Sequence, residues 1–169
     1  FCLSRGLGDV YKRQGYNQLA WKLRQDERVI NMEKQNIRAV TAEQLGELVD
    51  FISIDVAFIS LDKVLPVATT LLKDTGSLVA LIKPQFEAGK EKVGKGGIVR
   101  ERAVHEEVLS RILQVAYDCK LYLHGLTFSP IKGTEGNIEF LGYFTKSEEG
   151  ALSITDELIT AVVDEAHML

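Results

Sequence analysis

The sequence predicts a doubly wound α/β fold whose sheet is mostly parallel and ends in an antiparallel hairpin. Unbroken or nearly unbroken apolar runs at residues 50–59 and 77–82 are typical of strands buried on both faces of a sheet. Apolar residues at helical spacing follow each run, and this alternation favours parallel pairing. Two further strand patterns, at 121–128 and 138–145, are joined by a short loop that contains glycine, which predicts the hairpin.

Length and composition indicate one ordinary globular domain. The chain has 169 residues, of which 46% are hydrophobic and 26% charged, and its net charge of −4 excludes general nucleic-acid affinity through bulk charge. Cys2 and Cys119 have neither metal-ligand nor disulfide-framework spacing, which fits a reducing compartment. No apolar stretch has the length of a membrane span and no secretory signal is visible, so we expect a cytoplasmic protein that uses neither a membrane nor a metal.

The first part of the chain is the least regular. Residues 1–14 lack an initiator methionine and any clear period, and they resemble a translated sequencing-adapter tail. We expect a tail foreign to the domain, the alternative being a genuine but frayed terminus. The helical pattern then begins, and Trp21 is expected to pack. Further along, Thr41 is placed to cap a short helix, with Gln44 at the capping-box position.

The stretch at residues 76–99 organises the site. Its strand ends at Lys83, because Pro84 removes a backbone donor and holds the preceding residue extended. A loop rich in glycine and lysine follows. Ligands on open α/β sheets bind outside the carboxyl ends of the strands, so Lys83 lies at the edge where a site is expected. The alternative is a lysine that simply faces water.

Two carboxylates are expected to join this lysine. Asp55 interrupts or ends one buried strand, and Glu139 lies in the last one. A charge in such a run is costly unless it is paired or functional, so we expect the heads of Asp55, Lys83 and Glu139 within roughly 8 Å of one another. One interpretation is a buried ion network. The other is a site that holds an alcohol for nucleophilic attack, with Lys83 acting either as a neutral base or as an orienting cation.

Two helices complete the pattern. Residues 100–120 form the longest, with His105 expected at its surface or boundary, and residues 147–169 carry an amphipathic C-terminal helix. His105, His124 and His167 have no metal-ligand spacing.

Five stretches carry a resemblance to a known family: residues 15–26 (GYNQLAWKLRQD), 55–61 (DVAFISL), 82–89 (IKPQFEAG), 94–100 (GKGGIVR) and 135–140 (EGNIEF). From residue 15 to about 146 the chain resembles the TlyA family of hemolysin-like enzymes, a branch of the FtsJ-like RNA 2′-O-methyltransferases. The resemblance implies a Rossmann-like methyltransferase sheet, S-adenosylmethionine as cofactor, and transfer to cytidine 2′-hydroxyls of ribosomal RNA.

The resemblance also assigns residues to roles. It implies catalytic roles for Asp55, Lys83 and Glu139, the last three members of a Lys-Asp-Lys-Glu set whose first lysine falls in a segment absent here. The implied cofactor contacts are Glu33, Asn36, Ile37 and Asp55. Phosphate contacts from the glycine-rich loop are expected at Lys90, Lys92, Lys95 and Arg100. We expect residues 85–98 to be exposed and ordered mainly by RNA or cofactor.

The sequence departs from the family pattern before residue 15. The small RNA-binding domain, the first strand and its glycine-rich cofactor loop are absent, and residues 10–14 (VYKRQ) stand where the ribose-binding acid belongs. We therefore expect a partial methyltransferase domain at 15–146 whose sheet lacks its first strand. The strand at 51–56 should then have an unpaired inner edge, because residues 1–14 look too polar and irregular to replace the missing strand. The chain as given is expected to be inactive.

Two other functions stay open. One is a non-catalytic RNA- or ribosome-binding module. The other is a membrane-active hemolysin, which the lack of an apolar span or a strongly basic amphipathic helix disfavours.

Overall fold

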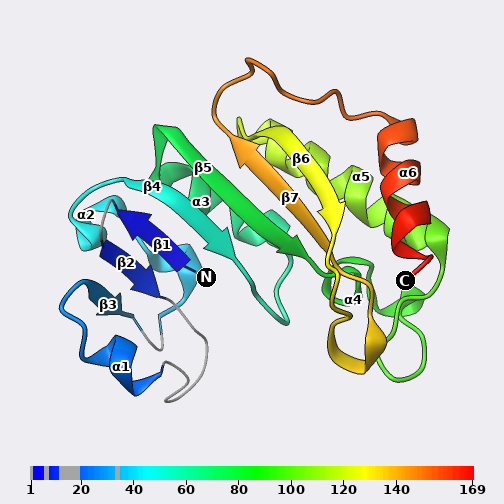
Figure 1. Cartoon of the computed structure of the whole chain (residues 1–169), viewed down its shortest axis with the longest axis horizontal. Helices are drawn as coiled ribbons and strands as arrows, with labels where there is room; N and C mark the ends of the chain where they lie inside the picture. The colour runs from blue at the N-terminus through cyan, green and yellow to red at the C-terminus, as the bar shows by residue number, and fades with distance from the viewer. Residues whose placement is uncertain (1, 6–7, 12–19, 33–34) are drawn as a thin grey trace.

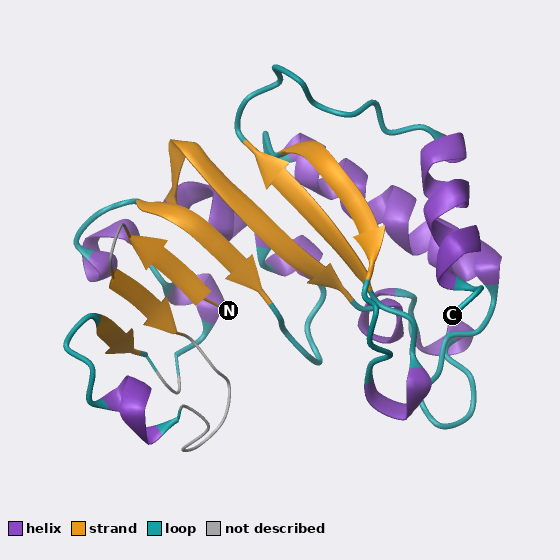
Figure 2. Cartoon of the chain, in the orientation of Figure 1, coloured by secondary structure: helices purple, strands orange, loops and turns teal. Residues whose placement is uncertain are grey.

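The computed structural model describes residues 2–5, 8–11, 20–32 and 35–169 (Figure 1). Its centre is a seven-stranded sheet in the order β3-β2-β1-β4-β5-β7-β6 (Figure 2). The strands are β1 (Cys2–Arg5), β2 (Gly8–Tyr11), β3 (Val29–Asn31), β4 (Val49–Ile54), β5 (Leu72–Ile82), β6 (Tyr122–Phe128) and β7 (Phe140–Thr145).

The pairings give the sheet one dominant direction. Strands β2 and β3 pair in parallel, as do β4 and β5, whereas β1 is antiparallel to both β2 and β4, and β7 to both β5 and β6. It follows that β2 to β6 all run the same way, with only β1 and β7 reversed. The predicted α/β sheet and its C-terminal hairpin are confirmed. Counted by neighbouring pairs, however, the sheet is mixed rather than mostly parallel, because each reversed strand lies between two others.

The N-terminal residues correct two expectations. Residues 2–5 and 8–11 form a hairpin, and β1 pairs with β4 through Leu3 and Ile52, so the inner edge of β4 is not unpaired. The physical reason is that a strand edge offers backbone donors and acceptors, which a short segment can satisfy whatever its side chains. Trp21, in α1 (Trp21–Arg24), is 70% exposed, so the expectation that it packs is also wrong.

The helices confirm the expected alternation with shifted bounds. The α-helices are α2 (Ala42–Leu45), α3 (Leu65–Leu71), α4 (Pro84–Glu87), α5 (Arg102–Asp118) and α6 (Asp156–Ala166). Single 3₁₀ turns are η1 (Ile37–Ala39), η2 (Leu61–Lys63), η3 (Lys90–Lys92) and η4 (Thr134–Gly136). Thr41 caps α2 in the predicted capping box with Gln44. The sequence predicts a helix over residues 61–73 with a stop signal at 74–76, but α3 is shorter because β5 begins at Leu72 and takes in that stop signal.

One apolar core joins the sheet to the helices behind it in Figure 1, α3 and α5. Most of the largest fully buried side chains come from β4, β5 and β7, including Ile52, Leu78 and Phe140. The inner stripe of α5 is buried at Val108, Leu109 and Ile112. This core fixes the strand ends on which the site is built.

His105 was expected near the surface and is instead fully buried. Its Nδ1 lies 2.9 Å from Nε2 of His167, and its ring meets Phe140 edge to face. The physical reason is that α6 packs on α5 and covers a second face of that helix. Burial, followed by the charge of His167, lowers the pKa of His105 to about 4. Among the described residues, no helix combines the length and apolar character needed to cross a bilayer.

Candidate functional site

Three candidate residues, each next to a different strand, lie at one end of the sheet. Strands β3, β4 and β5 run in the same direction, so their carboxyl ends lie at this edge, and the reversed strand β7 begins there. Asp55 follows β4, Lys83 follows β5, and Glu139 precedes β7. We call this end of the sheet, where β3, β4 and β5 finish and β7 begins, the catalytic edge.

Lys83 and Asp55 form an ion pair. The Nζ–Oδ1 distance is 2.6 Å, and the lysine side chain is 16% exposed against 69% for the aspartate. Lys83 keeps an extended backbone and Pro84 starts α4 directly after it, as the sequence predicts. The Lys83 side chain is largely enclosed, and its one carboxylate partner faces water. This leaves room for a second oxygen ligand on the lysine.

Glu139 stands at the same edge as Lys83. Antiparallel β5 and β7 pair Ile82 with Phe140, so the next residue on each strand is Lys83 and Glu139. The Glu139 residue is 7% exposed, and its Oε1 accepts a hydrogen bond from Gln85 Nε2 at 2.9 Å. Of the expected cluster, the Asp55–Lys83 contact is direct, and Glu139 is next to it in register and hydrogen-bonded to Gln85. The closeness of the Glu139 carboxylate to the two other charged groups stays a prediction.

Phe58 projects from the loop after β4. Its side chain is 91% exposed and its φ of 61° lies in the left-handed region, which residues other than glycine seldom adopt. The ring centroid lies 4.9 Å from that of Phe86 on α4. A strained, exposed aromatic residue near a charged site is a feature of ligand-binding surfaces, and the sequence interpretation did not single it out.

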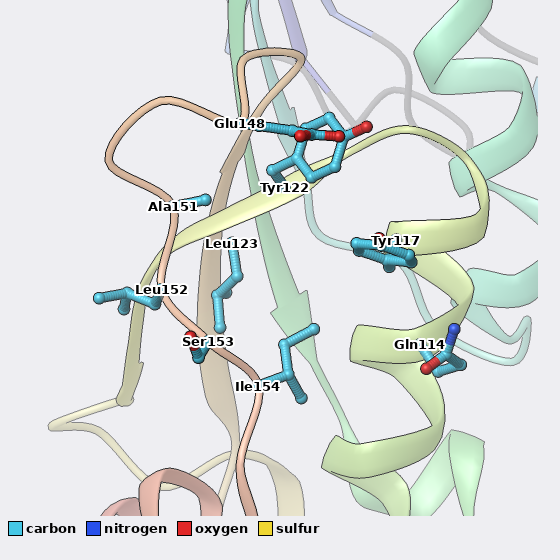
Figure 3. Close-up of a pocket in the computed structure, with 9 residues that line it drawn as sticks. All are labelled: Gln114, Tyr117, Tyr122, Leu123, Glu148, Ala151, Leu152, Ser153 and Ile154. Atoms are coloured by element: carbon cyan, nitrogen blue, oxygen red, sulfur yellow. The ribbon is translucent and has the colours of Figure 1, made fainter.

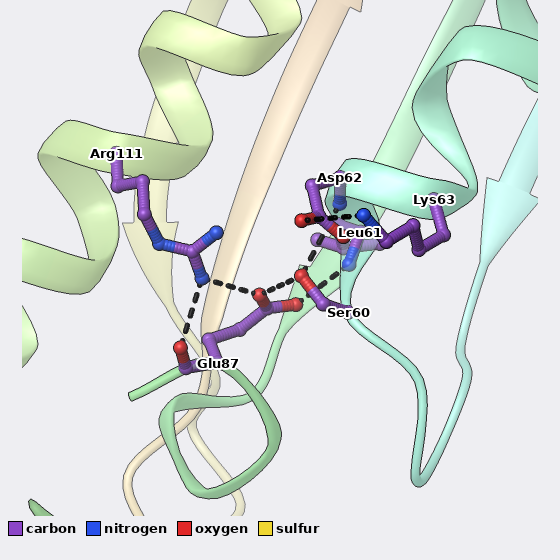
Figure 4. Close-up of polar contacts among 6 residues, drawn as sticks. All are labelled: Ser60, Leu61, Asp62, Lys63, Glu87 and Arg111. Carbon is purple, nitrogen blue, oxygen red and sulfur yellow. Dashed lines mark hydrogen bonds and ion pairs between the residues drawn. The ribbon is translucent and has the colours of Figure 1, made fainter. Parts of the chain in front are cut away.

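A buried carboxylate holds the loops behind the catalytic edge (Figure 4). Glu87 accepts hydrogen bonds from Ser60 Oγ at 2.6 Å and from the Leu61 backbone nitrogen at 2.8 Å. Arg111 of α5 pairs with the same carboxylate at 2.8 Å and also donates to the Glu87 carbonyl oxygen. These contacts join the loop after β4 to α4 and α5. Ser60 and Glu87 lie in the stretches DVAFISL and IKPQFEAG, which carry the family resemblance. The sequence analysis assigned roles in these stretches only to Asp55 and Lys83.

Asn137 ties the glycine-rich loop to the loop between β6 and β7. Its Oδ1 accepts from the Val99 nitrogen at 3.0 Å, and its Nδ2 donates to the Gly97 carbonyl at 2.9 Å. Asn137 itself is 2% exposed. Both loops lie at the catalytic edge, so this buried amide fixes their separation.

The expected RNA contacts differ in their surroundings. Lys90, Lys95 and Arg100 are exposed. Lys92 is exposed as well, but its ammonium is paired with Glu107 of α5. Within residues 85–98, the stretch 89–97 is largely exposed, whereas Glu87 is buried, so the expectation of an exposed loop holds only beyond α4.

The expected cofactor contacts form no complete cradle. Glu33 lies outside the described residues. Asn36 caps η1 by accepting from the Arg38 nitrogen, and Ile37 is 3% exposed within the core, which leaves Asp55 as the polar side chain at the edge. Cofactors on such sheets approach the carboxyl end of a central strand and its glycine loop. The strand beside β4 is β1, which runs the opposite way and presents its amino end there. The described residues therefore fit the substrate side of a methyltransferase site but not the cofactor side.

A separate cavity of about 380 Å³ lies between α5, the start of β6 and the segment before α6 (Figure 3). Tyr117 and Tyr122 meet there edge to face. A hydrogen bond to Glu148 raises the pKa of Tyr122. Tyr122 aligns through Thr145 with Ser77, six residues before Lys83, so the cavity lies roughly 20 Å from the catalytic edge. None of the residues expected at the site lines it. Among the described residues, no three His, Cys, Asp or Glu side chains are arranged to hold a metal ion.

Comparisons with known proteins show the family of the chain. Residues 13–146 match the FtsJ-like methyltransferase family. The chain is 51% identical over 160 residues to YqxC of Bacillus subtilis, described as a candidate rRNA methyltransferase, covering 90% of this chain and 56% of that protein. It is 37% identical over 152 residues to the 16S/23S rRNA (cytidine-2′-O)-methyltransferase TlyA of Mycobacterium tuberculosis, covering 89% and 57%.

A solved structure extends the agreement to the fold. A candidate hemolysin from Streptococcus thermophilus superposes with a TM-score of 0.87 at 46% identity, covering 94% of this chain and 57% of that one. The chain thus spans little more than half the length of these relatives.

Proposed function

Because the chain belongs to the FtsJ-like methyltransferase family, we propose that its protein transfers a methyl group from S-adenosylmethionine to a cytidine 2′-hydroxyl of ribosomal RNA. The observation that carries this proposal is the Lys83–Asp55 ion pair at the catalytic edge, with Glu139 next in register. The relatives named for cytidine 2′-O-methylation supply the substrate class.

The residues suit methylation of an alcohol. Methyl transfer is an in-line displacement, so much of the rate comes from holding the hydroxyl oxygen in the correct direction. In an ion pair Lys83 is an ammonium, which donates a hydrogen bond to the ribose oxygen while Asp55 fixes its position. Glu139 is a second carboxylate at the same edge, placed to take part in removing the hydroxyl proton.

The surroundings suit a single nucleotide drawn out of an RNA structure. The exposed ring of Phe58, supported by Phe86, offers a flat apolar surface on which a base can stack. Lys90, Lys95 and Arg100 are exposed and free to meet phosphates. Lys92 is a weaker candidate, since RNA would have to compete with Glu107 for its ammonium.

The cofactor enters this proposal through the family rather than through the described residues. S-adenosylmethionine supplies the methyl group when bound. Of the residues expected to hold it, Asp55 is placed at the edge where the cofactor and the ribose must meet.

The test is methyl transfer from radiolabelled S-adenosylmethionine to ribosomal subunits, using the full-length protein. The proposal predicts labelled 2′-O-methylcytidine in the RNA digest, and no label in a model RNA whose target carries a 2′-deoxyribose. Labelled bases or labelled protein would contradict it. Binding to subunits without any transfer would favour the docking-module alternative.

A further inference from the structure

We propose that Gln85 is a positioning residue for methyl transfer, acting through Glu139. This inference rests on the proposed function, and it adds a residue to the site that neither the sequence interpretation nor the family comparison assigned. Gln85 lies on α4, two residues after Lys83, and donates from Nε2 to Glu139 Oε1 at 2.9 Å.

The Gln85 amide has only one acceptable orientation. Its Oε1 is buried and has no hydrogen-bond partner among the described residues. An unsatisfied buried acceptor costs on the order of 1–3 kcal/mol. Turning the amide over would relieve nothing, because it would place that oxygen against the Glu139 carboxylate. The Gln85 amide nitrogen is therefore held on Glu139, while the amide oxygen is left without a hydrogen-bond partner among the described residues.

The backbone of Gly133 lies against the same oxygen of the carboxylate. A Cβ built at this glycine would overlap Oε1 and Cδ of Glu139. The Gly133 nitrogen donates to the Asn137 carbonyl at 2.8 Å, which holds the loop against the carboxylate. The Gln85 donor and the Gly133 backbone thus both lie against Oε1 of Glu139, whereas the described residues make no hydrogen bond to its Oε2.

This arrangement is what a proton-accepting carboxylate beside Lys83 requires. One oxygen is fixed by a neutral donor and the other remains available at the catalytic edge. A hydrogen bond to a charged group is stronger than one between neutral groups. Losing it frees the carboxylate to rotate out of line, so the effect falls on the transfer step rather than on binding.

The test is single-turnover methyl transfer by the full-length protein carrying Gln85→Met, Gln85→Glu and Glu139→Gln, alone and combined. Gln85→Met, similar in size and without a donor, should lower the transfer rate by roughly 10–100-fold, with RNA and S-adenosylmethionine affinities unchanged. Gln85→Glu keeps the shape but opposes two carboxylates, so it should lose at least as much. A purely steric role predicts that both variants stay active.

A double-mutant cycle tests whether Gln85 acts through Glu139. In the Glu139→Gln background, Gln85→Met should have no further effect; an additive loss would overturn the proposal. The matched control is Gln114→Met, because Gln114 Nε2 donates to Asp118 at the same 2.9 Å but far from the edge, and it should leave the rate unchanged. A rate in Gln85→Met above half that of the unmodified protein would also refute the role.

A structural readout separates this proposal from the proposed function. A crystal structure of the Gln85→Met protein should show the Glu139 carboxylate displaced, whether or not the protein methylates RNA. An unmoved carboxylate contradicts the positioning role. Absence of transfer by the unmodified protein contradicts the proposed function instead.

Discussion

At the scale of single residues, Glu87 supports the site without belonging to its chemistry. Its carboxylate accepts hydrogen bonds from Ser60, from the Leu61 nitrogen and from Arg111. It therefore sets how the loop that carries Asp55 and Phe58 lies against α4, which carries Gln85. A buried acceptor with this many donors tolerates no exchange of oxygen for an NH₂ group.

Glu87→Gln should accordingly lower the free energy of unfolding by about 2 kcal/mol, since one donor would face the new amide nitrogen and the ion pair with half-exposed Arg111 would be lost. Chemical denaturation of the full-length protein measures this loss. Glu91→Gln, at an exposed position of the neighbouring turn, is the control and should change stability by less than about 0.5 kcal/mol. Equal stability of the two variants would show that the cluster is not a structural support.

Several residues at the site could be predicted from sequence and others could not. Lys83 was predictable because a strand run, a lysine and Pro84 follow one another directly. The contact among Gln85, Gly133 and Glu139 joins distant segments of the chain. It depends on the register of β5 and β7, and no local sequence pattern encodes that register. Phe58 could not be singled out because an aromatic residue in an apolar stretch of sequence is typical of a buried core position.

At the scale of elements, α5 and α6 are coupled through two histidines, buried His105 and half-buried His167. His105 of α5 faces His167, which follows α6, and the pKa values of both are lowered, first by burial. Arg102 and Lys132 lower that of His167 further, whereas Asp164 opposes them. The folded state favours the neutral form of both histidines, so protonation of either one opposes the packing of α6 on α5.

The consequence is acid sensitivity of the fold. Unfolded His105 binds a proton near its ordinary pKa of 6.5, but folded His105 only near 4, so the unfolded state holds more protons between these values. Stability should be independent of this group above pH 6.5, fall by up to about 3 kcal/mol as the pH drops to 4, and level off below that. Urea unfolding from pH 7.5 to 4 measures the slope. His105→Leu should flatten it, and an unchanged slope would contradict the assignment.

The glycine-rich loop should separate into two parts in hydrogen exchange. Amides of residues 89–97 are largely exposed and should exchange roughly 100-fold or more faster than those of β5, because few buried contacts hold them. The amides of Gly94 and Gly97, bonded to the carbonyls of Ile98 and Gly94, are expected exceptions. Ribosomal RNA should slow exchange in this stretch. Strong protection throughout without RNA would indicate a structural element instead of a binding loop.

Element boundaries show where the sequence was sufficient. The strands around the core and the hairpin follow from apolar runs and turn residues, and they were predicted within a few residues. The end of α3 was misplaced because residues 72–73 continue the helical pattern and residues 74–76 resemble a helix stop, although β4 draws this stretch into β5 through an irregular register. His105 was misplaced because periodicity alone cannot tell which second face a later helix will cover.

At the scale of the whole molecule, no described strand pairs in parallel with β4 on the side where the cofactor is expected. β1 occupies that position in reverse, with its amino end at the catalytic edge. The chain of 169 residues alone should therefore give no measurable heat of S-adenosylmethionine binding in calorimetry. Placing the first strand and glycine loop of a relative before residue 15 should restore binding. Tight, stoichiometric binding by the 169-residue chain would show that the cofactor site lies elsewhere.

The central claim is that the Lys83 ammonium at the catalytic edge directs methyl transfer. Lys83→Ala in the full-length protein should slow single-turnover transfer to ribosomal RNA by about a thousandfold, with S-adenosylmethionine affinity unchanged. The matched control is Lys73→Ala, which removes a lysine near the start of β5, the strand that Lys83 follows; Lys73 is paired at 2.8 Å with Asp50 of β4, at the opposite end of the sheet. The account predicts full transfer by Lys73→Ala and almost none by Lys83→Ala; equal rates for the two variants would contradict it.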